Sequence, residues 1–238
     1  MLFTGLREST GNGPDSVAET ETTSVTPGAG ADPESAVATV EALARALELH
    51  DYRRGAFGET AAHITRVTRL ALALAELAAP DLLHKAQLEF GFRLHDIGMI
   101  GVPSETLVKP GRLTQSELDE IREHPWLGER IVAPVPGLSG IAREVIACHH
   151  ERWDGSGYPR GLRGLEIPLA ARIFAIVDAF DAMTHDQPYR EALTAAEALS
   201  EIRATAGTLF DPELAAAFVS VQAGVDAAAA FLASTTEA

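Results

Sequence analysis

The sequence predicts an all-α protein with one helical domain, which runs from about residue 37 to 223. Two observations carry this prediction. From Val37 onward, apolar residues recur at the three- and four-residue spacing of a helix face. No stretch alternates apolar and polar residues for long enough to build a sheet, and only residues 154–167 leave room for a small hairpin. Residues 1–36 read as a disordered acidic leader and residues 224–238 as an Ala-rich tail.

Each expected helix rests on its own apolar spacing and on the residues that bound it. The spacing of Val40, Leu43 and Leu47 predicts the first helix. The stretch Thr114-Gln-Ser-Glu117 has the pattern of a capping box, and the glycines and proline within 98–103 break the helical pattern. Further helices are expected at 64–77, 85–96, 114–122, 124–133, 139–151, 169–185, 194–206 and 211–223.

Composition and charge exclude several classes of function. The 238-residue chain has a formal charge of -15, which excludes a duplex nucleic-acid surface because such a surface needs a basic footprint. An anionic substrate must be attracted by local cations or metal ions, since the overall field opposes it. The single cysteine, Cys148, rules out an internal disulfide and suits a reducing cytoplasm. The longest apolar run, residues 70–83, is shorter than the roughly 20 residues of a membrane span. No signal peptide is evident, so a cytoplasmic protein without a membrane segment is expected.

Five of the eight histidines stand in settings that suit metal ligands. His63 shares a helix face with Val67 and Leu70, and on its own it would more often be an ordinary core histidine. Glu59 precedes it by one helical turn, however, so a carboxylate and an imidazole can meet at one ion. The other four occur beside an acid, as a neighbouring pair or at a helix start, in His95-Asp96, His149-His150 and His124-Pro125.

The positions of these residues allow more than one arrangement. His95-Asp96 is expected at the end of a helix, and adjacent helical residues point about 100° apart. Each residue can therefore reach a different ion, or Asp96 can bridge two. His124 alone is equally well explained as an exposed residue at a helix start. Asp178 lies in an otherwise apolar run, where a buried carboxylate needs a compensating partner such as a metal ion.

Taken together, these nitrogen and oxygen ligands suit two or three ions of iron or manganese. Zinc is less favoured because the chain has no thiolate cluster, and Cys148 is expected to be a small buried residue. Two ions about 3.5–4 Å apart can activate a bridging hydroxide and neutralise a phosphodiester during in-line attack. The residues therefore predict a helical metallohydrolase that acts on phosphate esters.

Eight motifs, in this order, carry a family resemblance: ETAAHITRV (59–67), LHDIG (94–98), VKPGRLT (108–114), EHPWLG (123–128), HHERWDGSGYPRGLRG (149–164), IPLAARIFAIVDAFDAMT (167–184), PYR (188–190) and FDP (210–212). The chain thereby resembles the HD-GYP family of bacterial phosphodiesterases, a branch of the HD-domain phosphohydrolases. The resemblance implies an HD-type helical bundle with a short irregular Gly-Tyr-Pro loop. It also implies hydrolysis of cyclic di-GMP to linear pGpG, to GMP, or to both.

The resemblance also implies roles for single residues. His95 and Asp96 would be catalytic, with Asp96 bridging metal ions, and Glu59 matches a glutamate with which some members hold a third ion. The Gly157-Tyr158-Pro159 loop would hold the dinucleotide, and Arg190 would meet a phosphate. The implied metal ligands are Glu59, His63, His95, Asp96, His124, His149, His150 and Asp178.

Two residues depart from the family pattern. Met99 stands where the family usually has lysine, and Gln187 where it usually has arginine, and neither can offer a charged donor to phosphate. By analogy with losing one preorganised donor, each change is expected to slow the reaction by on the order of 10²-fold. Two alternatives therefore stay open. One is an impaired domain that binds cyclic di-GMP or docks a partner, and the other is a hydrolase of another nucleotide phosphodiester.

Two smaller expectations complete the sequence interpretation. Arg172 and Asp181 are expected to form a buried ion pair that supports Asp178. The Ala-rich tail allows a contact in a homodimer, and regulation is expected from metal state, oligomerisation or a separate signalling partner.

Overall fold

The computed structural model describes residues 33–52, 59–109, 111–186 and 191–222. Within these ranges the structure is built from helices and loops without a strand, and a single bridge joins Ala206 and Phe210. The predicted all-α class is therefore confirmed. The small hairpin considered at 154–167 is wrong, because this segment forms a loop with one short 3₁₀ turn. The tail at 224–238 and most of the leader at 1–36 lie outside the described residues.

The helices follow the apolar spacing of the sequence and end close to the expected residues. The prediction missed α4 and the three 3₁₀ turns, which are too short to show a period. In chain order the elements are α1 (Pro33–Tyr52), α2 (Glu59–Ala78), η1 (Pro80–Leu82), α3 (Ala86–Arg93), η2 (Ile97–Gly101), α4 (Ser104–Leu107), α5 (Gln115–Arg122), α6 (His124–Val132), α7 (Ile141–Cys148), η3 (Gly164–Glu166), α8 (Leu169–Thr184) and α9 (Ala195–Thr205), and residues 212–222 are also helical.

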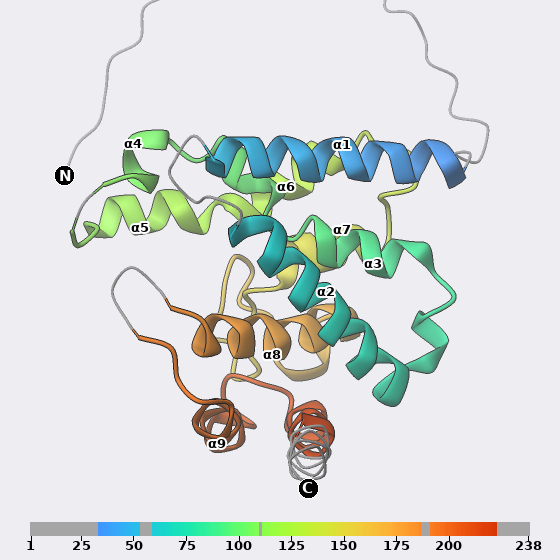
Figure 1. The fold of residues 1–238 in the computed structure, drawn as a ribbon, viewed down its shortest axis with the longest axis vertical. Helices are drawn as coiled ribbons and strands as arrows, with labels where there is room; N and C mark the ends of the chain where they lie inside the picture. Colours follow the sequence, from blue (N-terminus) through green and yellow to red (C-terminus); the bar gives the residue numbers. More distant parts are fainter. Residues whose placement is uncertain (1–32, 53–58, 110, 187–190, 223–238) are drawn as a thin grey trace, which may run out of the picture.

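Helix α8 is the centre of the bundle (Figure 1). It packs against α2, α7 and α9, while α1 lies across one end of the molecule and α9 lies near the other with residues 212–222. The sequence of α8 explains this position, because its apolar residues cover more than one face. None of the helices in the described ranges is long and apolar enough to cross a membrane.

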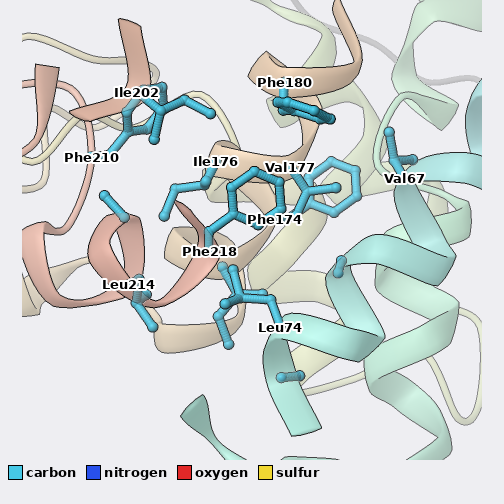
Figure 2. Packing of buried hydrophobic residues seen from close by; sticks show 14 of the residues in the cluster. Val67, Leu74, Phe174, Ile176, Val177, Phe180, Ile202, Phe210, Leu214 and Phe218 are labelled. Atoms are coloured by element: carbon cyan, nitrogen blue, oxygen red, sulfur yellow. The ribbon is translucent and has the colours of Figure 1, made fainter. Parts of the chain in front are cut away.

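The larger apolar cluster surrounds α8 (Figure 2). Phe174 and Val177 of α8 are fully buried, and Val67 of α2 and Ile202 of α9 belong to the same cluster. Phe174 stacks on Phe92 of α3, with ring centroids 5.3 Å apart. Each such side chain contributes roughly 1.5–3 kcal/mol when it is removed from water. This cluster fixes α8 relative to α2 and α3, the elements that surround the candidate site.

A second apolar cluster holds α1 against the opposite side of the bundle. Val40 and Leu47 of α1 pack there with Leu94 and Ile97. Since Phe92 belongs to the first cluster and Leu94 to the second, the short turn between α3 and η2 is held by both. Two buried clusters therefore fix the backbone of the residues that the sequence places at the metal site.

Candidate metal centre

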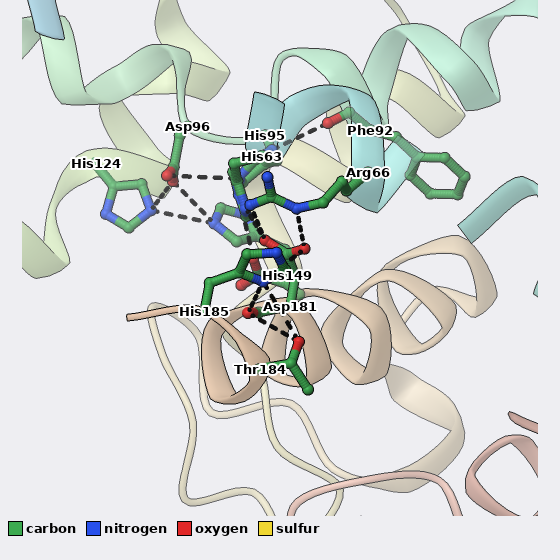
Figure 3. A network of polar contacts seen from close by, with 11 residues as sticks. His63, Arg66, Phe92, His95, Asp96, His124, His149, Asp181, Thr184 and His185 are labelled. Carbon is green, nitrogen blue, oxygen red and sulfur yellow. Dashed lines mark hydrogen bonds and ion pairs between the residues drawn. The ribbon is translucent and has the colours of Figure 1, made fainter. Parts of the chain in front are cut away.

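Two neighbouring groups of side chains gather seven of the eight residues that the sequence proposed as ligands, and Figure 3 labels five of them: His63, His95, Asp96, His124 and His149. In each group, one ligand atom per residue lies within 4.8 Å of the ligand atoms of the others. The first group contains four residues and the second contains three. They are Asp96, His124, His149 and His150 in the first, and His63, His95 and Asp178 in the second.

Five parts of the fold supply these side chains. His63 comes from α2 and Asp178 from α8, while His124 is the first residue of α6, as expected. The histidine pair follows the last residue of α7. His95 and Asp96 are not at a helix end as expected, because α3 stops at Arg93. The backbone there is held instead by hydrogen bonds between residues three apart, as in a 3₁₀ helix. They run from Ile97 N to Leu94 O (3.0 Å) and from Met99 N to Asp96 O (2.8 Å).

Backbone carbonyl groups orient three of the histidine rings. The Nδ1 atom of His95 lies 3.0 Å from the Phe92 oxygen, that of His124 lies 2.8 Å from the Ile121 oxygen, and that of His149 lies 3.0 Å from the Ile146 oxygen. A carbonyl can only accept, so each Nδ1 carries a proton, and in a neutral ring Nε2 is then left to present a lone pair to the centre. This is the arrangement in which proteins hold histidines for metal ligation.

The inward-facing atoms are spaced as the ligands of one cation would be. His124 Nε2 lies 3.1 Å from His149 Nε2 and 3.2 Å from Asp96 Oδ1, so two lone pairs and a carboxylate face one another in a buried place. Ligand bonds of about 2.0–2.2 Å at one ion place ligand atoms about 3–3.5 Å apart, which agrees with these separations. The other oxygen of Asp96 lies 3.4 Å from His95 Nε2 in the second group. Asp96 thus faces both groups, the position from which a carboxylate can bridge two ions.

The pKa values reflect this crowding. Burial lowers the pKa of His149, and it lowers the pKa of His150 to about 2, so both imidazoles stay neutral. Burial alone would also lower the pKa of His95, but the charge of Asp96 raises it to about 9. Burial opposes ionisation of Asp96, yet His95 and the other imidazoles hold its pKa well below the usual range. The neutral imidazoles of His149 and His150 beside a negative carboxylate suit a divalent cation.

A buried carboxylate orients His63, and the sequence interpretation missed it (Figure 3). Asp181 is 3% exposed, and its Oδ2 lies 2.8 Å from His63 Nδ1. Arg66 donates to both oxygens of Asp181, at 2.6 and 2.9 Å. The other ring nitrogen of His63 faces Asp178, with Nε2 and Oδ1 3.5 Å apart. In proteins that bind metal ions, a carboxylate commonly holds a ligand histidine in this way.

The ion pair expected between Arg172 and Asp181 is wrong. Nine residues separate them on one helix, about 13.5 Å along its axis, which is beyond side-chain contact. Arg172 pairs instead with Asp211 at 2.5 Å. Asp211 also accepts the backbone N–H of Glu213 at 2.9 Å at the start of the helical residues 212–222. Arg172 therefore links the start of the helical residues 212–222 to α8.

The loop with the Gly-Tyr-Pro motif is folded around a second acid that the sequence interpretation left without a role. Glu151 is buried and accepts the backbone N–H groups of Arg160 (2.7 Å) and Leu162 (3.0 Å). The Tyr158 ring stacks on His150, with centroids 4.8 Å apart and 25° between the planes. Burial and the nearby carboxylates raise the pKa of Tyr158, so its hydroxyl remains a neutral donor. Gly157, Tyr158 and Pro159 thus lie beside the first ligand group.

Three of the proposed site residues cannot be placed. Gln187 and Arg190 lie outside the described residues, as does the side chain of Glu59 at the first residue of α2. Met99 is described: it is half-buried and packs against the second apolar cluster. Cys148 is buried and outside both groups, and burial raises the pKa of its thiol to about 11, which fits the expected small core residue.

Comparison with known proteins gives a family for this arrangement. A family model described as "HD domain" matches residues 35–214, most of the chain. The chain belongs to the HD-domain family. A cyclic di-GMP phosphodiesterase of Thermotoga maritima is 39% identical over 165 residues, which cover 69% of this chain and 45% of that protein. A cyclic di-GMP phosphodiesterase response regulator of Xanthomonas campestris pv. campestris is 40% identical over 175 residues, which cover 73% of this chain and 45% of that protein.

The HD-domain chain therefore spans less than half the length of these two relatives. Other relatives, from Vibrio cholerae, are named 3'3'-cGAMP-specific phosphodiesterases. The fold is similar to a solved HDG"Y"P protein from Bdellovibrio bacteriovorus, with a TM-score of 0.55 and 19% identity over 79% of this chain and 64% of that one. The family that the ordered motifs predicted is thus confirmed.

Proposed function

We propose that this HD domain is a metal-dependent phosphodiesterase that hydrolyses cyclic di-GMP. One observation carries the proposal: two groups of histidine and aspartate ligand atoms converge, and Asp96 faces both of them. The names of the two relatives described above supply the substrate. The products, linear pGpG, GMP or both, follow from the resemblance and belong to the proposal.

Each part of the site has a role in this reaction. The two groups would hold divalent ions, iron or manganese by the chemistry of the ligands, and Glu59 would complete a site for a third. When bound, such ions supply an activated water and neutralise the charge of the phosphodiester. His95 and Asp96 would be the catalytic residues, because they would hold the ions that act on the phosphate. The protonated hydroxyl of Tyr158 can donate to a phosphate oxygen, because its pKa is raised.

The second candidate is a domain that binds the dinucleotide or docks a partner without efficient turnover. The observation in its favour is Met99, whose side chain packs against the second apolar cluster and offers no charge to a substrate. The slower reaction expected from Met99 and Gln187 remains a prediction, as does the cytoplasmic location. Homodimer formation and a separate signalling partner are also predictions.

The test is turnover of cyclic di-GMP by protein purified without oxygen and loaded with iron or manganese. We expect hydrolysis that is lost in His124→Ala and kept in Lys85→Ala, an exposed position outside both ligand groups. Parallel assays with 3'3'-cGAMP decide the substrate. If 3'3'-cGAMP is cleaved and cyclic di-GMP is not, the substrate is a nucleotide phosphodiester other than cyclic di-GMP. Binding of cyclic di-GMP without turnover, restored by Met99→Lys with Gln187→Arg, would favour the second candidate.

A further inference from the structure

Among the described residues, the proposed function assigns no charged partner to the second half of the substrate. A cyclic dinucleotide carries two phosphodiester groups on opposite sides of its ring, and the metal centre would engage one at a time. The chain has a formal charge of -15, so its overall field repels the second phosphate. Cationic side chains beside the centre are therefore needed to hold it.

Two arginines near the centre are already engaged. Arg66 donates from Nε and Nη2 to the two oxygens of the buried Asp181. Arg160 is held by Glu129, with both carboxylate oxygens 3.1 Å from its Nη2. These guanidinium groups stabilise α2, α6 and the Gly-Tyr-Pro loop. A ligand would have to break those contacts in order to use them.

Arg122, the last residue of α5, lies over the face of Tyr158. Its Cζ atom is 5.8 Å from the ring centroid, while the same ring stacks on the metal-site residue His150. The side chain is 51% exposed, and its ion pair with Asp119 is a surface contact of 3.3 Å. Exposed pairs of this kind contribute little. The guanidinium can therefore leave Asp119 for an anionic ligand at small cost.

Arg152 stands on another side of the centre. It lines a pocket of about 170 Å³ together with His149, His150 and Asp178, three of the proposed ligands. Within the described ranges its guanidinium makes no hydrogen bond or ion pair. The rest of the wall is mainly apolar, which suits a nucleobase or a sugar, and is formed by Glu151, Ala175, Ala179, Leu209 and Phe210.

We propose that Arg122, over the Tyr158 ring, and Arg152, in the pocket beside His149 and His150, form an anion subsite that binds the second phosphate of a cyclic dinucleotide. Arg122 lies over the ring that stacks on His150, and Arg152 lines a pocket with the same histidine, so both cations lie beside the first ligand group. The subsite supplies the positive charge that the Met99 side chain lacks. This inference rests on the proposed function.

The experiment compares two substrates, cyclic di-GMP and bis(4-nitrophenyl) phosphate, which has one phosphate only. Arg122→Ala, Arg152→Ala and the double variant are assayed beside Arg203→Ala, which removes the same charge from an exposed position on α9. We expect KM for cyclic di-GMP to rise roughly tenfold or more per arginine, the loss of one charged hydrogen bond. The rise for the simple diester should be at least tenfold smaller. Arg203→Ala should match the wild type on both substrates.

An unchanged KM for cyclic di-GMP in the double variant would overturn the subsite, as would equal losses on both substrates. Failure of the proposed function gives a different result, in which the wild type cleaves the simple diester and no cyclic dinucleotide. In that case the variants are compared by calorimetric affinity for cyclic di-GMP. An affinity that falls tenfold supports the subsite, and an unchanged affinity refutes it.

Discussion

Replacing Gly98 by alanine should loosen the metal centre although residue 98 is not one of its ligands. Gly98 lies in η2, directly against the first turn of α6. A Cβ atom added there would lie 1.9 Å from the carbonyl oxygen of His124 and 2.5 Å from the backbone nitrogen of Gly128. These are backbone atoms four residues apart, which pair in the first turn of an α-helix. Rotation of a side chain cannot relieve such a clash.

The required movement can be worked out from these distances. Real Cβ contacts are essentially never shorter than 3.0 Å, so η2 and the start of α6 must separate by about 1.1 Å. Metal sites tolerate about 0.2 Å in ligand distances. Asp96 and His124, whose Oδ1 and Nε2 atoms are 3.2 Å apart, lie on opposite sides of this contact. We expect metal affinity to fall by roughly 10–100-fold, and stability by about 1–3 kcal/mol from overpacking.

The assay is metal content and metal affinity of Gly98→Ala, measured beside its unfolding free energy and helical circular dichroism. Gly101→Ala is the matched control in the same turn, because its Cβ would meet the Leu127 side chain at 3.1 Å, and that side chain can rotate away. The control should bind metal as the wild type does. If Gly98→Ala bound metal with wild-type stoichiometry and affinity, the close contact would not position His124 and the reasoning would be wrong.

Three further predictions concern the residues around the centre. Asp181→Asn removes the charge that orients His63, and we expect a roughly tenfold weaker metal affinity in titrations with manganese; an affinity equal to that of Asp119→Asn would contradict it. Glu151→Ala leaves two backbone N–H groups of the loop without their acceptor, so denaturant unfolding should show a loss of about 2 kcal/mol, and a loss below about 0.5 kcal/mol would refute the role. Lys109 and Thr114 lower the pKa of Glu117 from 4.5 to about 2, so this carboxylate stabilises the fold above pH 4.5 and loses its effect as the pH falls through 2. The Tm difference between the wild type and Glu117→Gln should accordingly be full at pH 6 and shrink towards pH 2; a constant difference would contradict the assignment.

The sequence was sufficient to predict the longer helices and to name the seven residues that the structure gathers into two groups. Helical spacing located α2 and α8 because their apolar faces are long. Pairs such as His149-His150 stood out because adjacent polar residues interrupt an apolar helix. The Thr114–Glu117 capping box was predicted and is present, since caps depend only on local sequence.

The supporting contacts were harder to predict because they join distant segments. Asp181 meets His63 across 118 residues, and only the packing of α2 on α8 brings them together. A signal was nevertheless present: Asp178 and Asp181 are three residues apart, as are His63 and Arg66, so each pair shares a helix face. Glu151 left no such signal, because its partners are backbone N–H groups of an irregular loop.

The most direct test of the account is the metal stoichiometry of the wild type and of Asp96→Ala, measured by elemental analysis on samples purified without oxygen and assayed for turnover. Asp96 faces both ligand groups. The account predicts at least two iron or manganese ions per wild-type chain, together with hydrolysis of cyclic di-GMP, and loss of both metal and hydrolysis in Asp96→Ala. A wild-type protein that hydrolyses the dinucleotide without bound metal, or an Asp96→Ala variant with full metal content, would contradict it.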